Sequence, residues 1–202
     1  MREAEADVVV FKWRRPVPPA RGILAVIREV ARLQELPAIT VQIDVGLDEA
    51  DLYAYLRLRR ATIAPAVALA RALERVGGVG GARAARLAQL QEIRGASAGA
   101  AVAFHYVVET DVAAEAEGDM NDWYNQEHLL GLAAVPGTVR AQRFLNLDGA
   151  PRYHSCYELV DRDTLRSAPW LAVRNTAWSG RIRRAFQNTK RTMFRRIAEQ
   201  PV

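Results

Sequence analysis

The sequence predicts an α+β protein made of two ferredoxin-like βαββαβ repeats, whose antiparallel sheets pack face to face as a pseudo-symmetric barrel. Strand and helix patterns follow the order strand, helix, strand, strand, helix, strand, which is that of a ferredoxin-like unit. The same order begins again after the small-residue stretch at 95–99, which suits a linker. Landmark residues also recur 100 positions apart: Leu47-Asp48 as Leu147-Asp148, and Tyr53 as Tyr153.

The first repeat is expected over residues 1–95. Residues 7–13 are dense in β-forming side chains and predict a buried strand. From Ile23 to Leu33 apolar residues recur every three or four positions, which predicts an amphipathic helix that must end before Pro37. The remaining elements expected here are strands at 39–46 and 51–59, a helix at 63–76 and a strand at 84–93.

The second repeat is expected over residues 100–200. It begins with a strand at 100–109 and a helix at 121–134 that stops before Pro136-Gly137. The later elements are strands at 138–146 and 152–160 around the hairpin dipeptide Asp148-Gly149, a helix between Leu165 and Phe186, and a strand at 189–197. Each sheet would carry helices on one face only, so the other faces are expected to pack together around a cavity for a small ligand.

Composition limits the function classes. Of 202 residues, 50% are hydrophobic and 25% charged, and no apolar run is long enough to span a membrane. The lone Cys156 cannot form an internal disulfide, so we expect a cytoplasmic protein without membrane partners. The net charge of +5 arises from a basic segment at 162–202, which raises nucleic-acid binding as a hypothesis. A solvated face or a dimer rim explains it better, because no aromatic-basic recognition motif accompanies it.

All three histidines, His105, His128 and His154, lie in the second half of the chain. They suggest a metal site, yet no compact ligand spacing is present, and we therefore expect no metal. For His105 and His154 a structural role is favoured over a ligand role, although both could add polar groups to a cavity.

His128 lies in an unusual segment, where Trp123, Tyr124 and Glu127 accompany it within little more than two helical turns. Tyr124 and His128 are four residues apart and share a helix face, as do Trp123 and Glu127. A histidine beside a polar aromatic can remove a proton from a small substrate and return it elsewhere. The alternative is that Trp123 belongs to a core stripe while His128 and Glu127 are ordinary surface groups.

This segment resembles a known family. The residues that carry the resemblance are Asp122 to Leu129, Leu132 to Gly137, Arg143-Phe144, Arg152-Tyr153, Tyr157 to Leu159 and Ser167 to Trp170. They are similar to the EthD-like branch of the dimeric α+β barrel superfamily. The likeness covers residues 100–197 and is architectural only over 1–95.

The resemblance implies a ferredoxin-like barrel in which His128 faces the cavity as the acid/base residue. Glu29 stands near the equivalent position of the first half, so any active site there is expected to be lost. The superfamily includes cofactor-free monooxygenases, lactone isomerases, polyketide cyclases and dehydratases, and haem peroxidases, so the fold alone does not select a reaction.

The leading hypothesis is a cofactor-independent enzyme that acts on a small aromatic or polyketide-like oxo compound by proton transfer, as an isomerase, cyclase, dehydratase or other lyase. His128 would be the general base, Tyr124 or Tyr106 would polarise an oxygen, and Glu127 or a neighbouring histidine would orient the imidazole. The expected substrate-binding residues are His105, His154, Tyr106, Trp123, Tyr157 and Arg143, with Arg191 as a second group able to pair an acidic substituent.

Three alternatives remain open at this point: a ligand-binding barrel without catalysis, a haem protein that uses a histidine as axial ligand, and a monooxygenase-type member. The partner expected in every case is a small molecule. Two tandem chains could also associate as a homodimer of barrels.

Overall fold

The structure, a computed structural model, describes residues 6–14, 19–33, 40–48, 50–61 and 82–201. Its strands hydrogen bond in the closed order β1-β3-β2-β8-β5-β7-β6-β4, so the predicted α+β barrel class is confirmed. The runs β4-β1-β3-β2 and β8-β5-β7-β6 within that order each follow the strand order of a ferredoxin-like unit. No helix in these ranges has the length and apolarity needed to cross a membrane.

The chain divides into two compact units. Unit 1 comprises Met1–Gln89, Asn146–Gly149 and Phe194–Val202, and unit 2 comprises Leu90–Leu145 and Ala150–Met193. The long strands β4 (Arg83–Arg94) and β8 (Phe186–Pro201) therefore each contribute to both units. This division does not follow the expected boundary between residues 95 and 100, which remains a prediction about repeats.

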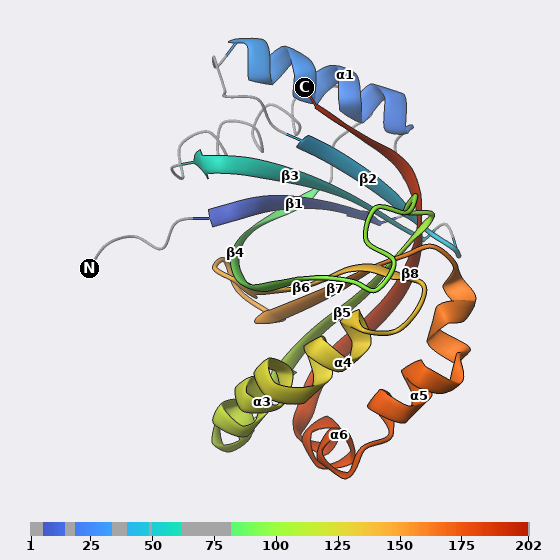
Figure 1. Cartoon of the computed structure of the whole chain (residues 1–202). Helices are drawn as coiled ribbons and strands as arrows, with labels where there is room; N and C mark the ends of the chain where they lie inside the picture. The colour runs from blue at the N-terminus through green and yellow to red at the C-terminus, as the bar shows by residue number, and fades with distance from the viewer. Residues whose placement is uncertain (1–5, 15–18, 34–39, 49, 62–81, 202) are drawn as a thin grey trace. The chain divides into compact units, whose positions relative to one another are not determined.

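Unit 1 contains β1 (Ala6–Arg14), α1 (Ala20–Leu33), β2 (Thr40–Gly46) and β3 (Asp51–Ala61), with β1 paired to both β3 and β4 (Figure 1). The predicted strands at 7–13, 39–46, 51–59 and 84–93 and the helix ending before Pro37 are confirmed. The helix predicted at 63–76 lies outside the described residues. Alternate strand residues such as Phe11 and Ile43 pack with Ile23 and Ile27 of α1 as an apolar core.

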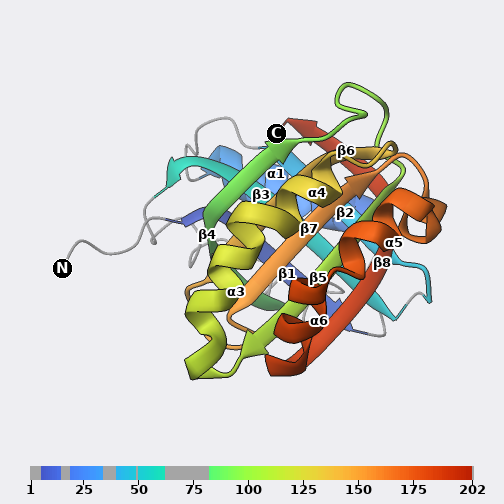
Figure 2. The same cartoon turned by 60° about the horizontal axis from the view of Figure 1, so that its bottom comes forward.

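Unit 2 carries the rest of the chain's helices that the structure describes. Its elements are β5 (Phe104–Val112), α3 (Glu117–Trp123), the π-helix η2 (Tyr124–His128), α4 (Leu129–Ala133), β6 (Thr138–Asn146), β7 (Tyr153–Leu159), α5 (Ala168–Arg174) and α6 (Ala177–Ile182), with short 3-10 turns η1 (Ala114–Ala116), η3 (Arg162–Arg166) and η4 (Arg183–Ala185). The helices lie over one face of the sheet (Figure 2). The first and third strands of the unit, β5 and β7, are antiparallel neighbours.

Two predictions for the helices of unit 2 are wrong in extent. The helix expected from residue 121 begins at Glu117, where acidic residues favour the positive helix N-terminus. The helix expected between Leu165 and Phe186 is broken, because the hydroxyls of Ser167 and Thr176 each accept a backbone N–H and start new helices.

Candidate functional site

A solvent-open pocket lies within unit 2, between its helices and its sheet. It holds about 490 Å³ of space free of protein atoms, counting the open mouth. Its lining residues are Tyr106, Val108, Trp123, Tyr124, His128, Leu132, Tyr157, Trp170, Arg174, Arg183, Phe186 and Arg191. The sequence predicts a cavity between the two sheets, whereas this pocket is on the helix side of the unit 2 sheet.

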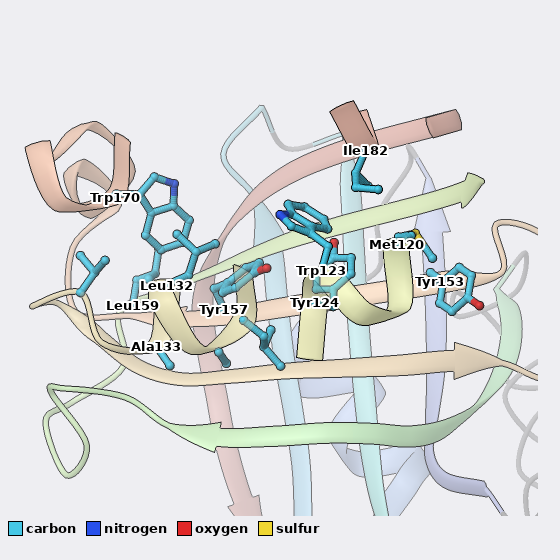
Figure 3. Close-up of a cluster of buried hydrophobic side chains, with 13 residues drawn as sticks. Met120, Trp123, Tyr124, Leu132, Ala133, Tyr153, Tyr157, Leu159, Trp170 and Ile182 are labelled. Carbon is cyan, nitrogen blue, oxygen red and sulfur yellow. The ribbon is translucent and has the colours of Figure 1, made fainter. Parts of the chain in front are cut away.

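Strand alternation supplies the floor of the pocket. Tyr106 and Val108 of β5 and Tyr157 of β7 are two residues apart or cross-strand partners, so they share the face covered by the helices. The stacked rings of Tyr106 and Tyr157 have their centroids 6.1 Å apart, and Trp170 of α5 packs edge-on against Tyr157 at 5.4 Å. Figure 3 shows Trp170 and Tyr157 among the aromatic side chains between the helices and the strands.

The wall opposite this floor depends on a π-helical turn. The backbone N–H of Leu129 donates to the carbonyl oxygen of Tyr124, five residues earlier, and such turns occur frequently at functional sites. The wider turn aligns His128 with Trp123, whose ring centroid lies 4.0 Å away in a stacked geometry. Tyr124 meets His128 edge-on at 5.5 Å. The structure therefore brings together Trp123, Tyr124 and His128, three of the four residues of this segment that were predicted at the site.

The imidazole of His128 is neutral. Burial, and secondarily the charge of Arg183, lower its pKa from the ordinary value of 6.5 to about 3. Its Nδ1 is buried and has no hydrogen-bond partner in the described part of the chain. An unsatisfied buried polar atom costs about 1–3 kcal/mol, and the residue that carries this one lines the pocket.

The pocket tyrosines are neutral phenols. Burial raises the pKa of Tyr106, Tyr124 and Tyr157, with nearby arginines opposing the rise in each case. The Tyr124 hydroxyl hydrogen bonds with Ser155 on β7. Tyr106 and Tyr124 can therefore donate a hydrogen bond to a substrate oxygen without becoming phenolates at neutral pH.

Arg143 is placed behind the pocket wall and does not line it. Its guanidinium carbon lies 4.2 Å from the ring centroid of Tyr124 and 4.5 Å from that of Tyr153, and Nη2 donates to Asn121 Oδ1 at 2.8 Å. Desolvation lowers its pKa, which the neighbouring tyrosines partly oppose. The predicted role in pairing an acidic substrate group thus does not fit its position, and Arg143 instead supports Tyr124 by a cation–π contact.

Arg174, Arg183 and Arg191 reach the pocket from three different elements, α5, η4 and β8. Arg183 donates from Nε to the carbonyl oxygen of Ser179 at 3.1 Å. Burial and the charges of Arg174 and Arg191 lower the pKa of Arg183, so the three cations are close enough to repel one another. No residue that lines the pocket is acidic.

Glu127 lies outside the pocket lining. Its Oε1 accepts a hydrogen bond of 2.6 Å from the Thr176 hydroxyl, which is also the N-terminal cap of α6. The carboxylate therefore ties the π-helix to α6. It holds the backbone that presents His128, and its hydrogen-bond donor is Thr176, whereas the predicted role was to orient the imidazole.

His105 and His154 lie on the face of the unit 2 sheet that is turned away from the pocket. In the pairing of β5 with β7, His105 lies opposite Glu158 and His154 lies opposite Glu109. These two pairs are four residues apart along the strands. His154 Nδ1 is 3.6 Å from Glu109 Oε1, and both side chains are buried. The structure therefore does not bring these two histidines to His128. Within the described ranges no group of three or more His, Cys, Asp or Glu side chains could hold a metal ion.

Sequence reasoning missed Arg174, Arg183 and Phe186 as pocket residues. Arg183 and Arg184 belong to the basic C-terminal segment, which the sequence presents as a solvated face. The prediction of one continuous helix is the reason, since the helix in fact ends and a new one begins at Thr176. A single helix would place the side chains of Arg174, Arg183 and Phe186 differently.

No protein-family model matches the chain, and no curated protein matches it. Solved structures do match it over almost its full length. A candidate monooxygenase from Fusobacterium nucleatum subsp. nucleatum superposes with a TM-score of 0.65 at 8% identity, covering 99% of this chain and 95% of that chain. An anthrone oxidase-like protein gives 0.64 at 12% identity, covering 99% and 94%.

A chlorite dismutase variant from Candidatus Nitrospira defluvii gives a TM-score of 0.63 at 14% identity, covering 96% of this chain and 92% of that chain. At such identities the likeness concerns the fold and not the reaction. The chain therefore has the ferredoxin-like α+β barrel fold shared by these proteins.

Proposed function

We propose that the unit 2 pocket is the active site of an enzyme that removes a proton from a small aromatic or polyketide-like oxo compound, with His128 as the general base. The observation that carries the proposal is the neutral imidazole at the pocket wall, whose buried Nδ1 has no partner in the described chain. A positioned base of this kind contributes about a hundredfold or more to a proton-transfer rate.

The residues around His128 supply the other parts of such a site. When the imidazole carries its own proton on Nε2, Nδ1 is free to accept one from an acidic C–H or O–H of the substrate. Tyr106 and Tyr124 would donate hydrogen bonds to the oxygen on which negative charge develops. Stacking on Trp123 fixes the ring plane of the base.

The anion formed in this way can be reprotonated elsewhere, which gives an isomerase, or can lose or attack a group, which gives a lyase or cyclase. The Trp-Tyr-x-x-Glu-His segment of α3 and η2 supports assignment to the EthD-like branch, and we retain that assignment as part of the proposal. Neither step requires a cofactor.

Reaction of the same anion with molecular oxygen is a second candidate function. A methylene carbon that has lost a proton could form a C–O bond with O2, and loss of water would leave a carbonyl, so that R2CH2 and O2 give R2CO and H2O. The fold neighbours described as a candidate monooxygenase and an anthrone oxidase-like protein favour this route.

The test measures exchange of the acidic methylene hydrogens of benzoylacetone, and of a derivative with a carboxylate on its ring, for deuterium in buffered D2O. We expect the wild-type protein to accelerate exchange with at least one probe and His128→Gln to remove that acceleration. Asn125→Ala, an exposed change on the same π-helix, is the matched control and should behave as wild type.

Three results would count against the proposal: no acceleration with either probe, full activity in His128→Gln, or a Soret band after haem addition that depends on His128. The last would assign the site to haem instead. Oxygen uptake that accompanies exchange would support the second candidate function.

A further inference from the structure

We propose that the ligand of this pocket is an aromatic compound that bears a carboxylate, and that Arg174, Arg183 and Arg191 form the subsite that holds the carboxylate. This inference rests on the proposed active site and adds the substrate class to it. It also assigns a function to three residues that the reaction itself does not use.

The three arginines come from elements far apart in the sequence and meet at one pocket. In the described chain none of them has a carboxylate partner, and Arg183 donates a hydrogen bond to a backbone carbonyl. Burial lowers the pKa of Arg183, and the charges of Arg174 and Arg191 lower it further. Like charges gathered without a counter-ion destabilise one another, and a bound anion would reverse this energy.

The rest of the lining limits what the anion can be attached to. Tyr106 and Tyr157 stack at the floor, and Trp170 stands edge-on to both, with ring centroids 6.4 Å from Tyr106 and 5.4 Å from Tyr157. Flat apolar faces of this kind favour a planar ring. Tyr106 also experiences the charges of Arg174 and Arg191, so the aromatic surface and the cationic surface adjoin.

Guanidinium groups suit a carboxylate because their fork of N–H donors matches its two oxygens. An aromatic carboxylate therefore meets both parts of the pocket at once, with its ring on the tyrosines and tryptophan and its charged group among the arginines. A neutral aromatic compound would fill only the first part.

An anion in this subsite would also act on the base. The charge of Arg183 contributes to the low pKa of His128. Burial is the larger cause of that low pKa and would persist, but a carboxylate beside Arg183 would offset the contribution of the arginine and raise the pKa of the imidazole. His128 would thus become a stronger base when a carboxylate ligand is bound than when a neutral one is.

Isothermal titration of the whole protein with naphthoate and with its neutral isostere naphthamide tests the subsite. We expect naphthoate to bind at least about tenfold more tightly than naphthamide, with the advantage shrinking as salt is added. The triple variant Arg174→Gln, Arg183→Gln, Arg191→Gln should lose this advantage and keep naphthamide binding. The matched control is Arg162→Gln, Arg166→Gln, Arg184→Gln, which removes the same charge from unit 2 outside the pocket lining.

The inference would be overturned if the wild-type protein bound naphthoate and naphthamide equally well. It would also be overturned if the control variant lost as much of the preference for naphthoate as the pocket variant. If the pocket variant failed to fold, Arg191→Gln alone should still lower naphthoate binding selectively. The two proposals fail separately. Arginine-dependent naphthoate binding without His128-dependent proton exchange would refute the catalytic proposal alone, and exchange with no preference for the carboxylate would refute the subsite alone.

Discussion

The strongest stability prediction concerns His128, whose low pKa makes folding depend on pH. Its pKa is about 3 in the folded protein and 6.5 when unperturbed, so between these values the unfolded chain binds a proton that the folded chain does not. Stability therefore falls as pH decreases from 6.5 toward 3. The linkage relation gives a loss of about 2 kcal/mol at pH 5, with almost none at pH 7.5.

Replacing the imidazole isolates this contribution. His128→Gln removes the titrating group, so the stability of wild type relative to the variant should rise by about 2 kcal/mol between pH 5 and pH 7.5. Urea unfolding of both proteins at the two pH values measures the difference, and every other titrating group cancels in the comparison. Equal pH dependence of the two proteins, or a larger loss in the variant at low pH, would refute the assignment of a buried neutral imidazole.

Three further predictions concern the scaffold of unit 2. Gly137→Ala should lower the unfolding free energy by about 1–3 kcal/mol in a thermal unfolding assay, because Gly137 has φ +98° and a Cβ there would clash with the Thr164 hydroxyl. Gly180→Ala, where a Cβ meets nothing within 4 Å, should not destabilise the protein in the same assay. Thr176→Ala should cost about 1 kcal/mol in urea unfolding through loss of the α6 cap, and Thr176→Ser should restore most of it. Tyr153→Phe removes a 2.5 Å hydrogen bond from the tyrosine hydroxyl to Glu117 and should lower the unfolding free energy by about 1 kcal/mol. The rate of hydrogen exchange in benzoylacetone should not change.

The strands were predictable because burial imposes a period of two on them. β6 begins and ends at the predicted residues, β2 differs from its prediction by one residue at one end, and β1 and β7 differ by one residue at each end. The predictions for β5 and β8 are wrong in extent, because β5 covers Phe104–Val112 instead of 100–109 and β8 covers Phe186–Pro201 instead of 189–197. Helix ends were less predictable, since a single hydroxyl can decide them. At Thr176 the choice between continuing and restarting a helix depends on one side-chain hydrogen bond, which apolar periodicity does not encode.

Part of the site followed from the sequence for the same reason. Trp123, Tyr124 and His128 are close in the chain, so any helical conformation brings them together. Arg174 and Arg183 meet these residues only through the packing of separate helices onto one sheet. The π-helical turn is equally invisible to a pattern of apolar residues, and with it His128 stacks on Trp123, five positions away, as well as meeting Tyr124, four positions away.

The contrast between the two units supports placing the proposed active site in unit 2. In the described part of unit 1 the helix-covered side of the sheet is filled by aliphatic and aromatic carbon, such as Val9, Phe11 and Ile43 against Ile27. Glu29, which stands near the position equivalent to His128, is exposed, and its carboxylate accepts a hydrogen bond from the nearby Arg32 guanidinium.

In unit 2 the same side of the sheet carries tyrosines, whose rings contribute to the core while their hydroxyls keep polar atoms at the helix–sheet boundary. Such a layer cannot close as tightly as one of branched aliphatic side chains, because each buried hydroxyl needs a partner. Space therefore remains beside His128, and the arginines at its edge set which ligands can fill it. One architecture thus yields a closed core where its helix-facing residues are aliphatic and a pocket where they are tyrosine, histidine and arginine.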